Sequence, residues 1–220
     1  MVISEKKSID EIIGYLKQKE NIIVIGCSEC ATVCQVGGDK EVAAMAKLLD
    51  SRGKNILACL VLSPACHLLA TKRELRKYKD QLVMADAVLS LTCGNGTQTI
   101  SKSTDIPVYP GTNTKFIGET QRIGKFEKAC MACGECKLGW TAGICPITKC
   151  AKGLVNGPCG GSKEGRCEVN PEWDCAWILI YERLKEMGML DNLIKLREAR
   201  SFKNSSGPEK INLRRKKTSL

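Results

Sequence analysis

Apolar and polar residues alternate in blocks along the first half of the chain, and these blocks predict helices and strands in turn. Ser8 and Glu11 form a capping box, and isoleucine and leucine recur behind it at helical spacing, which predicts a helix over residues 8–19. The next block, residues 21–26 (NIIVIG), is short, apolar and β-branched, as is typical of a buried strand.

The same alternation continues for about ninety more residues. Apolar positions from Val42 onward predict a second helix that stops near Gly53, and residues 55–62 (NILACLVL) predict a second buried strand. A capping box at Thr71 and Glu74 predicts a third helix. Two further strands are expected in the segments ADAVLSL and IPVY. Strands that alternate with helices indicate an α/β fold with a small, doubly wound, mostly parallel sheet.

The pattern changes after residue 118, and the domain prediction follows that change. Residues 1–118 are expected to form the doubly wound domain, and the polar stretch from Gly111 to Lys128 is expected to be a linker. Residues 119–200 are expected to form a cysteine-rich module with C-terminal helices. Residues 201–220 form a basic Ser/Gly/Pro/Asn-containing tail that is expected to be disordered.

The chain has 14 cysteines among 220 residues, and their chemistry depends on the cell compartment. Charged residues interrupt the N-terminus where a secretory signal needs an apolar stretch, and the longest apolar run is too short to span a bilayer. We therefore expect a soluble cytoplasmic protein without a membrane span. Cytosolic thiols are kept reduced, so metal binding is favoured over disulfides.

The formal net charge of +10 does not by itself indicate nucleic-acid binding. Much of the excess lies in the tail, and aromatic residues make up only 5% of the chain, which leaves little for base stacking. The remaining positive charge would offset anionic thiolate clusters or attract an acidic electron carrier. No nucleic-acid partner is expected.

Eight cysteines lie in the C-terminal module and are the candidate metal ligands there. They are Cys130, Cys133, Cys136, Cys145, Cys150, Cys159, Cys167 and Cys175. The first three have C-x2-C-x2-C spacing, which lets one tight loop present three thiolates to a single 4Fe-4S cluster. Eight thiolates match two 4Fe-4S clusters; one cluster with a zinc, two zincs, or metal-free buried thiols are the alternatives. The spacing leaves open which cysteine is the fourth ligand of the first triplet.

The last of these cysteines is predicted to lie on a helix with an apolar stripe. The stripe consists of Trp173, Trp177, Ile180, Leu184 and Met187. A core face or a subunit contact explains it.

The N-terminal cysteines follow predicted strands. Cys27, Cys30 and Cys34 follow the first strand, Cys66 the second and Cys93 the third. Because carboxyl ends of parallel strands meet at one edge, we expect a third metal site, holding 4Fe-4S or zinc, with Cys66 or Cys93 as its fourth ligand.

Three neighbouring features of this half have simpler interpretations. Cys59 lies within an apolar strand and is expected to be a core thiol. His67 is the only histidine, and a structural role is expected for it. Gly94-Asn95-Gly96 is expected to be a turn.

The segment NGPCGG (156–161) suits a loop beside a cluster because glycines allow close backbone approach. Its candidate cofactor-binding residues are Asn156, Gly157, Pro158, Gly160 and Gly161. Together with GRCEV (165–169) and GCSECATVCQVGG (26–38), this segment resembles the MetV family, the small subunit of heterodimeric bacterial methylenetetrahydrofolate reductase. The resemblance implies an iron-sulfur electron-transfer subunit that partners MetF, the catalytic subunit that carries FMN.

No phosphate-binding loop, nucleophile elbow or acid/base pair stands out, so we expect catalysis to belong to the partner. The expected function is non-catalytic: electrons pass from ferredoxin or another redox complex through the clusters to FMN, for reduction of methylenetetrahydrofolate to methyltetrahydrofolate. The alternative is a zinc-stabilised scaffold that organises a catalytic partner without carrying electrons.

Overall fold

The structure is a computed structural model that describes residues 1–199, 201–202 and 208–211. It divides into two compact units, Met1–Lys128 and Ala129–Leu220. The boundary therefore lies at residue 128, whereas the sequence placed it at 118, inside what the structure forms as a strand. Most of the basic tail lies outside the described residues, so its disorder stays a prediction.

A four-stranded parallel sheet forms the centre of unit 1. Its strands are β2 (Asn21–Cys27), β3 (Asn55–Leu62), β4 (Ala87–Leu91) and β5 (Val108–Pro110). They lie in the order β3-β2-β4-β5. In β2 the fully buried Ile22 and Val24 belong to one core cluster, and Ile23 and Ile25 belong to the other. Successive side chains of a strand point to opposite faces, so apolar residues on both faces need helices on both sides.

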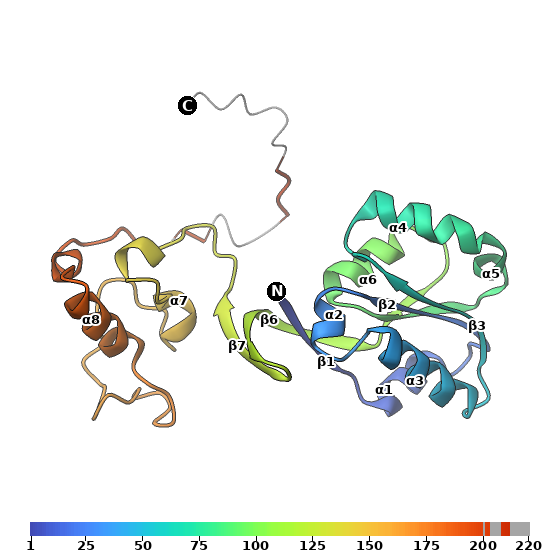
Figure 1. Ribbon diagram of the computed structural model, residues 1–220, viewed down its shortest axis with the longest axis horizontal. Helices are drawn as coiled ribbons and strands as arrows, with labels where there is room; N and C mark the ends of the chain where they lie inside the picture. Colours follow the sequence, from blue (N-terminus) through green and yellow to red (C-terminus); the bar gives the residue numbers. More distant parts are fainter. Residues whose placement is uncertain (200, 203–207, 212–220) are drawn as a thin grey trace. The chain divides into compact units, whose positions relative to one another are not determined.

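Helices cover both faces of this sheet. They are α1 (Ile9–Tyr15), α2 (Cys30–Val33), α3 (Asp39–Asp50), α4 (Leu68–Leu75), the 3-10 turn η1 (Arg76–Tyr78), α5 (Lys79–Met84) and α6 (Gly94–Ser101). Figure 1 shows α1 and α3 on one side of the sheet and α4, α5 and α6 on the other. The doubly wound α/β prediction is confirmed for this sheet.

The structure also contains a second, antiparallel sheet, which was not predicted from the sequence. It consists of β1 (Val2–Lys6), β6 (Thr112–Arg122) and β7 (Lys125–Cys130), in the order β1-β6-β7. Val2 pairs with Ile117 and Lys6 pairs with Thr112. The stretch expected to be a linker is therefore a strand pair. Its polar residues are tolerated because β6 is largely exposed.

Two local predictions in unit 1 were wrong. The hydroxyl of Thr71 is not a helix cap but donates to the Ala65 carbonyl oxygen at 3.0 Å inside α4. The helix instead begins after His67, whose Nδ1 accepts a hydrogen bond from the Ala70 N–H at 3.2 Å. Gly94, Asn95 and Gly96 form the first turn of α6 rather than a free turn.

Unit 2 is built from short elements around a small core. They are η2 (Leu138–Trp140), α7 (Pro146–Lys149), α8 (Ala176–Glu186) and η3 (Leu190–Leu193). Trp177, Ile180 and Leu184 are buried as predicted, but Trp173 and Met187 are about half exposed because they lie beyond the ends of α8. No helix in the described residues is long and apolar enough to cross a membrane.

Candidate metal centres

The C-x2-C-x2-C triplet begins at Cys130, the last residue of β7, and continues through a tight turn. Ala132 and Gly134 both have positive φ angles, 51° and 82°, which reverse the chain between successive cysteines. The Ala132 N–H donates to the Cys130 Sγ at 3.3 Å, and the Cys133 thiol donates to the Glu135 carbonyl oxygen at 3.7 Å. The loop therefore folds back on its own sulfur atoms, as a cluster-binding loop requires.

Helix α7 connects Cys145 to this loop. Cys145 is the N-cap of α7, and the Thr148 hydroxyl of the same helix donates to the Ala129 carbonyl oxygen at 3.1 Å. Ala129 directly precedes Cys130, so this bond ties the helix to the start of the triplet. We define Cys130, Cys133, Cys136 and Cys145 as the first thiol set.

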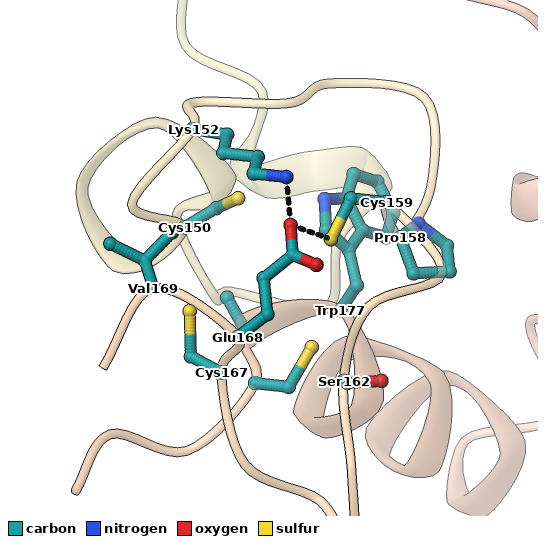
Figure 2. A pocket seen from close by; sticks show the side chains of 11 residues that line it. Cys150, Lys152, Pro158, Cys159, Ser162, Cys167, Glu168, Val169 and Trp177 are labelled. Carbon is teal, nitrogen blue, oxygen red and sulfur yellow. Dashed lines mark hydrogen bonds and ion pairs between the residues drawn. The ribbon is translucent and has the colours of Figure 1, made fainter. Parts of the chain in front are cut away.

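The other four cysteines of unit 2 line one hollow. We define Cys150, Cys159, Cys167 and Cys175 as the second thiol set. The hollow has about 340 Å³ of space not filled by protein atoms, part of it open to solvent. Figure 2 shows the labelled Cys150, Cys159 and Cys167 around it. Residues separated by 25 positions in sequence thus face one cavity, a grouping that the spacing did not predict.

Backbone pairing positions two members of the second thiol set. The Cys167 N–H donates to the Trp173 carbonyl oxygen at 2.9 Å, and the Cys175 N–H donates to the Gly165 carbonyl oxygen at 2.7 Å. An isolated bridge between Arg166 and Asp174 joins the same two segments. Cys175 itself is buried as the N-cap of α8 rather than within the helix as expected.

Two charged residues in the hollow were missed by the sequence analysis. The Glu168 carboxylate accepts a hydrogen bond from the Cys159 thiol at 3.3 Å and pairs with the Lys152 amine. Figure 2 shows this carboxylate between the two groups. Gly161 makes room for it, because a Cβ there would lie 1.4 Å from the Glu168 Oε2. The sequence did contain one indication of this charge, because Glu168 directly follows Cys167 in GRCEV.

The predicted cofactor-binding loop divides between two places. Pro158 lines the hollow of the second thiol set, next to Cys159. Asn156 and Gly157 instead line a separate hollow with Trp140 and Arg197. Gly160 is exposed and has a φ of 81°, and Gly161 lies against Glu168.

The donor chemistry of both sets fits a thiolate-bound metal. Thiolates are the ligands preferred by zinc and by iron-sulfur clusters, and each set offers four of them. In the described residues, no three Cys, His, Asp or Glu side chains are already arranged to hold a single metal ion. Bound metal would therefore need side-chain rotation to draw the sulfur atoms together.

In unit 1 the five predicted cysteine ligands lie at or beyond the carboxyl ends of β2, β3 and β4, with Cys27 as the last residue of β2. Cys27 is buried, Cys30, Cys34 and Cys93 are half-buried, and Cys66 is exposed.

The sixth cysteine of unit 1, Cys59, differs from the prediction. It is exposed because β3 is an edge strand of the sheet, with a neighbour on one side only. Burial of part of its surface still raises the pKa of this thiol above its ordinary value.

The fold and the cysteine groups define a class of protein: a doubly wound α/β unit joined to a cysteine-rich unit that holds two sets of four thiols. Residues 109–203 match the family described as "Methylene-tetrahydrofolate reductase C terminal". The match covers less than half of the chain but contains both thiol sets, and it supports a protein related to methylenetetrahydrofolate reductase, in the context of one-carbon metabolism. No curated protein matches the chain.

Proposed function

We propose that this chain is the non-catalytic electron-transfer subunit of a methylenetetrahydrofolate reductase. The first and second thiol sets would each hold one 4Fe-4S cluster. The observation that carries the proposal is the second thiol set, in which four cysteines from distant positions line one hollow. The family match over the same residues supplies the link to the reductase.

The residues of the hollow have separable roles in this proposal. The four thiolates are the ligands. The Lys152 amine pairs with the Glu168 carboxylate and offsets its negative charge beside the ligands, and Cys175 lies at the positive end of the α8 dipole as its N-cap. When bound, a 4Fe-4S cluster supplies one-electron transfer at a potential set by such neighbouring charges and hydrogen bonds.

The proposed partner is a MetF-like catalytic subunit that carries FMN. An electron carrier such as ferredoxin, or another redox complex, would supply single electrons to this chain. FMN would accept them and reduce methylenetetrahydrofolate to methyltetrahydrofolate. The flavin is required because it converts one-electron supply into two-electron chemistry.

Metal analysis of the full chain, purified anaerobically with its flavin partner, tests this proposal. Iron, acid-labile sulfide and zinc are measured per chain. Two clusters in unit 2 correspond to about eight irons. The Cys133→Ala and Cys167→Ala variants should each lose about four irons and electron transfer from a one-electron donor. Ser162→Ala, which changes a non-thiol residue of the same hollow, is the matched control and should retain both.

Double variants test the division into two sets. Adding Cys145→Ala to Cys133→Ala should remove no further iron, because both residues belong to the first thiol set. Adding Cys150→Ala to Cys133→Ala should remove the iron of both clusters. The reverse pattern would contradict the division.

A zinc-stabilised scaffold is the second candidate, and the small core of unit 2 favours it. Only a few apolar residues in the described part of unit 2 are buried, most of them on α8. A structural zinc site contributes about 10–16 kcal/mol of binding free energy to such small domains. Zinc without iron, and no absorption near 400 nm, would support the scaffold and exclude the electron relay.

A further inference from the structure

Unit 1 contains a group of five cysteines that the proposed function does not use. Cys27 ends β2, Cys30 and Cys34 lie on and just after α2, and Cys93 is the N-cap of α6 directly after β4. Cys66 lies in the connection from β3 to α4.

The strand order places four of these cysteines at the switch point of the sheet. β2 lies next to both β3 and β4, and the chain leaves β2 toward β3 but leaves β4 toward β5. Connections that diverge from adjacent strands open a crevice between their carboxyl ends, where α/β proteins bind ligands. Cys27, Cys30 and Cys34 follow β2, and Cys93 follows β4. Cys66 instead follows the edge strand β3.

Tight backbone packing fixes the cysteine-bearing loop over this crevice. The Cys27 N–H donates to the Gly37 carbonyl oxygen at 2.8 Å, which closes the loop that carries Cys30 and Cys34. A Cβ at Gly37 would lie 1.7 Å from the Leu91 carbonyl oxygen at the end of β4. The loop after β2 is therefore packed against β4, two residues before Cys93.

The sulfur atoms of Cys30 and Cys34 form hydrogen bonds with β1. The Val2 N–H donates to the Cys30 Sγ at 3.5 Å, and the Cys34 thiol donates to the Val2 carbonyl oxygen at 3.7 Å. These two bonds hold the sulfur atoms of Cys30 and Cys34 against the same residue of β1.

We propose that Cys27, Cys30, Cys34 and Cys93 form a tetrathiolate metal centre in unit 1, independent of the two thiol sets of unit 2. Four thiolates select a borderline or soft metal, either a zinc ion or an iron-sulfur cluster. The start of α6 supports the negative charge of such a centre, because the helix dipole is positive at Cys93. Cys66 is exposed and follows the edge strand β3, so we do not count it among the four ligands.

The test compares metal content in the full chain purified anaerobically. Cys93→Ser and Cys34→Ser should each lose the same metal, either one zinc or about four irons. Cys59→Ser is the matched control: this cysteine lies in the same unit, and no other thiol contributes to the shift of its pKa. Cys59→Ser and Cys66→Ser should keep the wild-type metal content. Wild-type content in Cys93→Ser, or equal loss in Cys66→Ser, would overturn the proposal.

Thiol labelling of the wild-type chain tests the same site without any risk of misfolding. Native chain is treated with iodoacetamide before and after chelation, and labelled cysteines are identified by mass spectrometry. Cys34 and Cys93 should be protected until the metal is removed, whereas Cys66 should be labelled from the start. Labelling of Cys93 before chelation would contradict the proposal. Because these cysteines lie outside unit 2, the outcome is independent of the iron assays on Cys133 and Cys167.

Discussion

Asn156 and Arg197 are joined by two hydrogen bonds that link distant parts of unit 2. The Asn156 amide donates to the Arg197 carbonyl oxygen at 2.8 Å, and the Arg197 N–H donates to the Asn156 side-chain oxygen at 2.7 Å. The Arg197 guanidinium lies 3.9 Å from the centre of the Trp140 ring. The first residue of NGPCGG therefore anchors the segment after α8, a structural role that the motif did not suggest.

Replacing Asn156 by alanine should loosen this anchor. The loss of two hydrogen bonds should lower the free energy of unfolding of unit 2 by about 1–2 kcal/mol. Urea unfolding followed by tryptophan fluorescence measures this, because all three tryptophans, Trp140, Trp173 and Trp177, lie in unit 2. Asn192→Ala is the control, since Asn192 accepts from Arg197 through its backbone carbonyl. Equal effects of the two variants would contradict the anchoring role.

Gly37→Ala should destabilise unit 1 by about 3 kcal/mol, because the new Cβ meets the backbone oxygen of Leu91, which cannot rotate away. Gly14→Ala is the opposite case: Gly14 lies in α1 and nothing lies within 4 Å of the new Cβ. It should stabilise by about 0.5–1 kcal/mol. Hydrogen exchange of β2 and β4 amides measures both. Protection unchanged by Gly37→Ala would refute the packing argument.

Asp86 should make unit 1 less stable in acid. The backbone N–H groups of Asn21 and Glu20 donate to its carboxylate at 2.8 and 3.0 Å and hold the pKa of Asp86 below its ordinary value. A lowered pKa gives stability that is present above about pH 4 and is lost as the pH falls through the folded-state pKa.

Asp86→Asn removes this titration. The variant should be less stable than wild type at neutral pH, and the difference should shrink as the pH falls below about 4. Urea unfolding followed by NMR signals of β2 gives the comparison. A constant difference between the two proteins across the acid range would argue against the assignment.

Glu168→Gln should raise the reduction potential of a cluster at the second thiol set, because it removes a negative charge beside the ligands. A shift of roughly 50 mV is expected, close to the 59 mV that a tenfold change in a one-electron equilibrium represents. Potentiometric titration monitored by EPR measures it. Glu164→Gln makes the same charge change at an exposed residue that does not line the hollow, and should shift the potential less.

The sequence determined several local elements and the donor chemistry, although the helix cap expected at Thr71 was wrong. The Ser8 cap, where the Ser8 hydroxyl accepts from the Glu11 N–H at 3.2 Å, and the bounds of β3 follow from neighbouring residues alone. The C-x2-C-x2-C triplet can also be recognised as a set of metal ligands from the sequence alone, because its three cysteines are close together in the chain. These features depend mainly on short-range sterics and hydrogen bonding between residues close in sequence.

Only the tertiary structure decided how these elements combine. Whether Cys59 is buried depends on β3 being an edge strand, and the second thiol set depends on how the segment that carries Cys167 pairs with the one before α8. The polar residues of β6 gave no apolar period because this strand is largely exposed, and its pairing with β1 joins residues more than a hundred positions apart. Long-range pairing and packing, which local patterns do not encode, therefore determine which cysteines face one another.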